Sequence, residues 1–256
     1  MVNRIYPIRF VPPSNHNDHP LLALAPIHSF ENGRIEQWFT HREWNQFRIK
    51  NILALQRMVA RIVTKQALLD MKKGWRPKDL EIMNEPSGIP YVLERDETRF
   101  QGISLSHTDR VAVGAVHRLG RVGTDIEEVK VRHPVFHQWV LQQIPLKIAK
   151  DFTDLVCDER LQVTMWWTVK EAIAKYCGTG FKDLRSSPVT KWIPTYIAPF
   201  DPGKSWFGSD VREAYGFFKI SGDRMLYTWL IVGSKRCACM VWDNSFIGGT
   251  NESFGR

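Results

Sequence analysis

The sequence predicts an α+β protein, and two long helical patterns together with several strand patterns support this fold class. Residues 51–71 place Leu55, Val59 and Ile62 on one helical stripe, and residues 161–177 form a second helical stretch ended by glycine. Short runs of apolar or alternating residues are typical of strands. The expected strands are 103–106, 111–116, 122–127, 215–220, 225–232 and 237–242. The last three are separated by short turns containing Gly and Ser, which predicts an antiparallel meander.

Composition and length indicate an ordinary globular protein. The chain has 256 residues, of which 43% are hydrophobic and 24% charged, enough for one large or two small domains. No apolar run reaches the length of a transmembrane helix, and the first residues lack the apolar core of a signal peptide. We therefore expect a cytoplasmic protein with no membrane partner.

The N-terminal region contains a helix start signal and a polar stretch. Thr40 and Glu43 have the spacing of a capping box, and residues 34–39 before them are interpreted as a strand. The first thirty residues are rich in Pro, His and Asn, and residues 16–19, which combine two His with Asn and Asp, are interpreted as a polar loop.

Basic residues accumulate around the first long helix. The formal net charge is +8, which favours an anionic partner. The stretch 48–78 holds one acid, Asp70, and nine basic residues at positions 48, 50, 57, 61, 65, 72, 73, 76 and 78. Arg57, Arg61 and Lys65 are spaced four apart, so they repel one another on one helical face. The face is either simply solvated or binds an anion that relieves this repulsion.

Carboxylates and a lysine form a second charged pattern. Asp125 and Glu127 lie two apart on an expected strand and point to one side of it. Glu171 and Lys175 lie four apart on an expected helix and share a face. Oxygen ligands favour Mg²⁺ or Mn²⁺ over zinc. The alternative interpretation is a set of surface salt bridges.

These residues also carry a resemblance to a known family. The two patterns are Gly123-x-Asp125-x-Glu127 and, some forty residues later, Trp167-Thr168-x-Lys170-Glu171-Ala172-x-x-Lys175. In this order and spacing they resemble the signature of the 4'-phosphopantetheinyl transferase superfamily, in its larger Sfp-type form. A Ser-His segment at 104–108 and a Gly-x-Pro element at 88–91 extend the resemblance over about residues 40–180.

The resemblance implies a particular fold. It is a pseudo-twofold arrangement of two similar halves, each an antiparallel sheet packed with helices, in a protein expected to be monomeric. Residues 1–118 would form the half with the basic helix that binds coenzyme A phosphates. Residues 119–245 would form the half with the metal and the catalytic carboxylates, and residues 246–256 a loose tail.

The resemblance also implies an activity. The 4'-phosphopantetheine arm of coenzyme A would pass to a serine of an acyl or peptidyl carrier protein, with Mg²⁺, or Mn²⁺ as the alternative, held by Asp125, Glu127 and Glu171. The serine would attack the β-phosphorus of the diphosphate, and 3',5'-ADP would leave. Glu171 would be the general base, with Glu127 or a metal-bound water as alternatives. Lys175 would neutralise the charge that grows on the phosphate.

Further residues are implied as contacts of coenzyme A. They are Arg57, Arg61, Arg48, Lys50, Gly88, Pro90, Ser106, His107 and Lys175. Among these, Arg57 is the best match for the residue that holds the 3'-phosphate. Ile89 departs from the family pattern, in which a basic residue often lies between the Gly and the Pro. Residues 133–152, an amphipathic stretch, belong either to the core or to a surface that meets the carrier.

Two other functions remain open at this stage. The positive charge and ten tryptophans also suit a module that binds single-stranded nucleic acid by phosphate contacts and stacking. However, the tryptophans do not interleave with the basic cluster, so we expect no nucleic-acid partner. A family member that has lost activity and only binds carriers is the third possibility.

Overall fold

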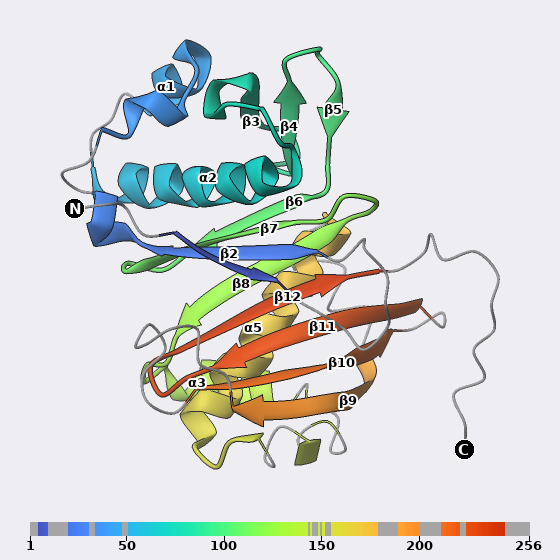
Figure 1. The fold of residues 1–256 in the computed structure, drawn as a ribbon. Helices are drawn as coiled ribbons and strands as arrows, with labels where there is room; N and C mark the ends of the chain where they lie inside the picture. Colours follow the sequence, from blue (N-terminus) through green and yellow to red (C-terminus); the bar gives the residue numbers. More distant parts are fainter. Residues whose placement is uncertain are drawn as a thin grey trace.

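The computed structural model shows an α+β protein built from antiparallel sheets and helices (Figure 1). It describes residues 5–9, 20–30, 34–47, 51–142, 144, 148, 150–151, 155–178, 189–199, 211–220 and 224–243. Among the described helices, none has both the length and the apolar character needed to cross a membrane.

A four-stranded sheet forms the first layer together with a long helix. Its strands, in spatial order, are β1 (Tyr6–Arg9), β2 (Leu21–Pro26), β7 (Val111–Val116) and β6 (Ile103–His107). Helix α2 (Ile52–Met71) covers one face of this sheet. A Cβ on Gly114 of β7 would lie 2.3 Å from Thr64 Oγ1 of α2, so this glycine permits the close approach of helix and strand.

A five-stranded sheet forms the second layer. Its strands, in spatial order, are β8 (Val122–Glu128), β12 (Arg236–Trp242), β11 (Arg224–Val232), β10 (Arg212–Ile220) and β9 (Val189–Pro199). Helix α5 (Glu159–Cys177) packs on it and contacts the shorter α3 (Pro134–Gln142). A Cβ on Gly123 of β8 would lie 1.9 Å from the Ala172 carbonyl oxygen of α5. Only glycine lets α5 lie this close to β8.

The two sheets pack face to face between the two long helices (Figure 1). Alternation along β2 sends Leu22 and Leu24 toward the second sheet and Ala23 toward α2. On β8, Ile126 joins the core between the sheets, while Asp125 and Glu127 face α5. The predicted common side for the two carboxylates is confirmed.

A smaller unit borders the first layer. Its three strands are β3 (Leu80–Asn84), β4 (Pro90–Glu94) and β5 (Arg99–Phe100), and its helices are η1 (Ile27–Phe30), η2 (Glu36–Trp38), α1 (His41–Gln46) and η3 (Pro77–Asp79). The capping box is confirmed: Thr40 Oγ1 accepts from the Glu43 amide, and Glu43 Oε2 accepts from the Thr40 amide.

One expectation for the N-terminal region was wrong. The segment 34–39 is not a strand, because η2 turns the chain so that the Trp38 carbonyl accepts a hydrogen bond from Lys65 Nζ at 2.7 Å. The apolar run Leu21–Pro26, for which no element was predicted, is strand β2 and is buried on both faces. Its continuous apolar character, without alternation, is typical of a strand covered on both sides.

Other predictions from the sequence are confirmed only in part. The meander is confirmed as β10–β11–β12, and the second helix runs from Glu159 to Gly178 at its left-handed C-cap. Pro134 begins α3 and does not interrupt a helix. The proposed boundary near residue 118 falls in the connection between β7 and β8, and it stays a prediction. Residues 16–19 and the tail 246–256 lie outside the described residues.

Candidate functional site

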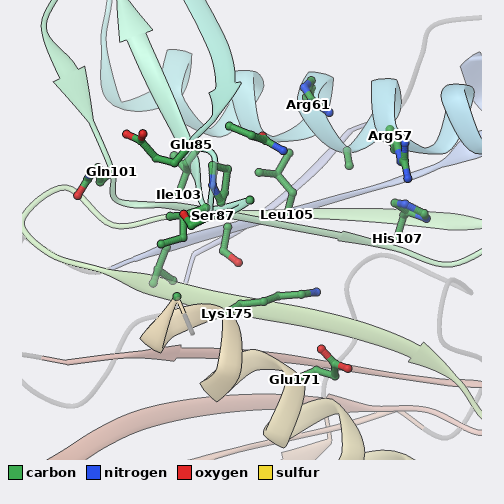
Figure 2. A pocket seen from close by; sticks show the side chains of 18 of the residues that line it. Arg57, Arg61, Glu85, Ser87, Gln101, Ile103, Leu105, His107, Glu171 and Lys175 are labelled. Carbon is green, nitrogen blue, oxygen red and sulfur yellow. The ribbon is translucent and has the colours of Figure 1, made fainter. Parts of the chain in front are cut away.

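A cavity of about 810 Å³ opens where the two layers meet α2 and the β3–β4 loop (Figure 2). Its lining includes side chains from α2, β6 and α5, so both halves of the chain contribute to it. The charged or titratable residues that line it are Arg57, Arg61, Glu85, His107, Arg121, Glu171 and Lys175. Cations outnumber carboxylates, and the cavity therefore favours an anionic ligand.

Two arginines of α2 face the cavity from one side (Figure 2). Arg57 is exposed, whereas the Arg61 guanidinium lies over the Phe47 ring at 4.9 Å. Among the described residues, buried Arg61 Nε has no hydrogen-bond partner. Burial lowers the pKa of Arg61, the charge of Glu43 opposes this, and Arg57 lowers it further. An anion in the cavity would relieve the repulsion between the two guanidinium groups.

His107, at the end of β6, lies near both Arg57 and Lys175. Its pKa is lowered from the usual 6.5, first by burial and then by the positive charges of Lys175 and Arg57. The imidazole is therefore neutral at pH 7 and can donate one N–H hydrogen bond. A bound anion would reverse the effect of the two cations and favour the imidazolium form.

Asp125 connects the two layers. Its Oδ1 accepts hydrogen bonds from Ser106 Oγ of β6 and from Lys175 Nζ of α5, both at 2.7 Å. The neighbouring Thr124 amide donates to Ser104 Oγ at 2.9 Å, so the Ser-His segment abuts the acidic strand. Asp125 is only 4% exposed.

Asp125 Oδ2 has a different environment from Oδ1. It is buried and, within the described part of the chain, has no hydrogen-bond partner. A buried carboxylate oxygen without a donor carries a desolvation cost that a cation or a further donor would offset. This atom is the feature of the structure that fits a divalent cation.

Glu127 is held by two groups in this structure. Its Oε1 accepts from the Trp167 indole Nε1 at 3.1 Å, and its Oε2 accepts from Arg132 Nη2 at 2.7 Å. Glu128, which alternation turns to the other face, lies 3.7 Å from Arg236 Nε. Glu128 therefore points away from the other two carboxylates.

Glu171 lies on α5 one turn before Lys175 and faces the cavity (Figure 2). Burial raises its pKa to about 7, the negative charges of Asp125 and Glu127 raise it as well, and Lys175 opposes them. The three carboxylates are therefore close enough to repel one another. As placed, though, no three His, Cys, Asp or Glu side chains in the described ranges are arranged to hold a metal ion.

The remaining residues of the α5 pattern have structural contacts. Thr168 Oγ1 donates to the Thr164 carbonyl, one turn earlier in the helix. Lys170 Nζ lies 5.4 Å from the Trp139 ring centroid and 5.6 Å from that of Trp166, which links α5 to α3. Burial lowers the pKa of Lys170 to about 8. Only Glu171 and Lys175 of this pattern reach the cavity.

The basic run does not form a single face that is either solvated or bound to an anion. Lys65 is fully buried and donates to Glu43 Oε2 at 2.6 Å, because α1 packs against this end of α2. Lys72 pairs with Glu94, and Arg76 lies 3.7 Å from Asp79. Of the described basic residues in the run, Arg57 and Arg61 line the cavity.

The structure brings together most of the predicted site residues. Those that line the cavity are Arg57, Arg61, Gly88, Pro90, His107, Glu171 and Lys175. Ser106, Asp125 and Glu127 connect to it through Lys175 and α5. Gly88 has a φ of 90°, which suits glycine in the β3–β4 loop. Arg48 and Lys50 lie outside the described residues.

Sequence reasoning missed several lining residues. Arg121 lies between the β7–β8 turn and the acidic strand, and Gln101 and Tyr176 also reach the cavity. The position of Arg121 two residues before Gly123 was visible in the sequence, but nothing there indicated which way it points. No family model matches this chain, and no curated protein matches it significantly.

Proposed function

We propose that this protein transfers the 4'-phosphopantetheine arm of coenzyme A to a serine of an acyl or peptidyl carrier protein, releasing 3',5'-ADP. The observation that carries the proposal is the convergence of Arg57 and His107 from one half with Lys175 and Glu171 from the other around one cavity. Coenzyme A carries a 3'-phosphate and a diphosphate, so it needs cations at separated points. The motif resemblance supplies the reaction, and the pseudo-twofold transferase fold is part of the same proposal.

The chain's residues would bind coenzyme A at two ends. Arg57 and Arg61 would hold the 3'-phosphate, with the neutral His107 donating an N–H or taking up a proton. The β3–β4 loop, with Gly88 and Pro90, would pack against the adenine. Lys175 would hold the diphosphate, which requires that it turn from Asp125 toward the ligand.

A magnesium ion fits the donor set of Asp125, Glu127 and Glu171. Asp125 Oδ2 is unsatisfied, and burial together with repulsion from Asp125 and Glu127 raises the pKa of Glu171. Both features favour a cation at this point. Bound there, magnesium would neutralise charge on the diphosphate. Glu127 and Glu171 would have to turn toward the ion, because they are not gathered around one point in this structure.

In this proposal Glu171 accepts the proton of the attacking serine. The carrier serine oxygen forms a bond to the β-phosphorus, and the bond from that phosphorus to the oxygen of the 3',5'-ADP leaving group breaks. The serine proton passes to Glu171, the carboxylate that lines the cavity on the same helix as Lys175. Lys175 stabilises the charge that grows on the departing phosphate. Glu127 remains the alternative base.

The carrier would approach from the side of α3. Val131 and Val135, which precede and begin this helix, are 81% and 67% exposed. They belong to the segment that leads from β8 into α3, so a carrier that binds there would meet exposed apolar side chains. Trp166, Trp192 and Trp242 are buried, and no described tryptophan lines the cavity, which gives no support to base stacking and a nucleic-acid function.

The decisive experiment mixes the protein with coenzyme A, magnesium and an apo carrier protein and then weighs the carrier. A gain of ~340 Da, one phosphopantetheine arm, supports the transferase. Asp125→Ala and Glu127→Ala should each abolish the gain while the far-ultraviolet circular dichroism stays that of the parent. An unmodified carrier that still binds the protein would favour the inactive carrier-binding function. Tight, salt-dependent binding of a single-stranded oligonucleotide, without transfer, would favour the nucleic-acid function.

A further inference from the structure

Arg132 makes a contact that the proposed reaction does not use. It follows β8 by four residues, its side chain is 15% exposed, and its Nη2 lies 2.7 Å from Glu127 Oε2. The guanidinium also lies over the Phe136 ring, 5.0 Å from its centroid. This ion pair is therefore sheltered from water and stronger than a typical surface pair.

Aromatic rings enclose the pair and fix its geometry. Phe136 packs edge-on against Trp167 at 4.9 Å, and Trp139 lies 6.0 Å from each of them. Trp167 donates to the second oxygen of Glu127. Both carboxylate oxygens of Glu127 thus already have a donor, and one of the donors carries a full positive charge.

We propose that Arg132 sets the affinity of the site for divalent cations by competing with the cation for Glu127. The proposal rests on the function proposed above, in which Glu127 is a metal ligand. A guanidinium and a divalent cation on one carboxylate repel each other, so Glu127 must loosen from Arg132 before it can serve as a ligand. Trp167 carries no charge and opposes the ion far less.

A matched control is available at Glu128, the next residue of strand β8. Arg236 lies 3.7 Å from Glu128, the residue next to Glu127, and the alternation of β8 directs this pair to the opposite face. Arg236→Gln therefore removes the same charge beside the neighbouring carboxylate of β8 without freeing a carboxylate of the site. The comparison separates direct competition from a general change in net charge.

The experiment measures Mn²⁺ binding by electron paramagnetic resonance, with and without coenzyme A, for the parent, Arg132→Gln, Arg236→Gln and Asp125→Ala. We expect Arg132→Gln to bind Mn²⁺ about 3- to 10-fold more tightly, as expected for loss of a half-buried charged hydrogen bond. Arg236→Gln should match the parent. The melting temperature of Arg132→Gln should fall in EDTA and recover toward the parent at saturating Mn²⁺.

Three other outcomes would overturn the inference, each differently. Unchanged or weaker Mn²⁺ binding in Arg132→Gln, with Asp125-dependent binding in the parent, would leave the proposed function standing and make Arg132 a support for Glu127. An equal loss of melting temperature with and without Mn²⁺ would make the pair purely structural. Absence of Mn²⁺ binding in every variant, with coenzyme A present, would remove the metal site of the proposed function as well.

Discussion

Two lysine–carboxylate pairs, Lys65–Glu43 and Lys175–Asp125, differ in how completely their polar atoms are satisfied. Lys65 Nζ donates to Glu43, to the Trp38 carbonyl and to the Pro77 carbonyl, and both partners are 0% exposed. Glu43 accepts two further hydrogen bonds, from the amides of Ile82 and Thr40. Every charge in this pair has its partners inside the protein.

The second pair, Lys175–Asp125, lacks a complete set of partners; we call it the open pair and Lys65–Glu43 the closed pair. Lys175 is 31% exposed and lines the cavity, and the second oxygen of Asp125 is buried without a donor. A lysine and a carboxylate thus form a fully paired support in one place and an incomplete site in the other. A complete set of partners indicates a structural role, and an unsatisfied buried oxygen beside a cavity indicates a ligand.

The largest loss of stability is expected from a variant that breaks the Lys65–Glu43 pair. Lys65→Met leaves the Glu43 charge buried without its cation, so the free energy of unfolding should fall by ~3–5 kcal/mol. Urea unfolding followed by circular dichroism measures it. Lys175→Met is the matched change in the open pair and should cost less than Lys65→Met, because Lys175 is 31% exposed and Ser106 still donates to Asp125. Equal losses for the two variants would show that the pairs do not differ in the way described.

The second prediction concerns catalysis at the open site. Glu171→Gln keeps the shape but cannot accept a proton, so we expect kcat for transfer to fall by ~10²-fold or more, with coenzyme A binding retained. Steady-state kinetics and calorimetry separate the two quantities. If kcat survives and only the magnesium requirement rises, Glu171 is a ligand and the base lies elsewhere.

A third prediction distinguishes the residues of the basic run. Arg57→Ala should weaken coenzyme A binding by ~1.5–3 kcal/mol, the value of a hydrogen bond to a charged group. Dephospho-coenzyme A, which lacks the 3'-phosphate, should bind parent and variant alike. Lys73→Ala, an exposed change outside the cavity, is the control and should have no effect. An equal loss with both ligands would place Arg57 away from the 3'-phosphate.

The smallest expected effect is a pH dependence. In the free protein the pKa of His107 lies below 6.5, since burial, Lys175 and Arg57 all disfavour the imidazolium. A bound anion raises that pKa, so protonation and binding help each other and coenzyme A affinity should rise as the pH falls from 7.5 through 6.5. The gain stays below about tenfold per pH unit for one proton. Calorimetric titration at several pH values should show a flatter dependence in His107→Gln, and identical slopes would contradict the role.

The sequence by itself determined much of the local structure around the site. Strand alternation placed Asp125 and Glu127 on one face, and a spacing of four placed Glu171 and Lys175 on one turn of α5. Both conclusions depend on the geometry of a single element, so neighbours in the chain are enough to reach them. The capping box at Thr40 followed from local spacing for the same reason.

Only the tertiary structure decided which charged side chains have a complete set of partners inside the protein and which face the cavity. Arg57 and Lys65 lie eight residues apart on one face of α2. Nevertheless, α1 brings Glu43 to Lys65, while Arg57 faces the cavity. Asp125 meets Lys175 fifty positions away, and Glu127 meets both Trp167 and Arg132. The charge of a side chain is a property of the sequence, but its partners come from distant elements, and burial among those partners fixes the energy of that charge.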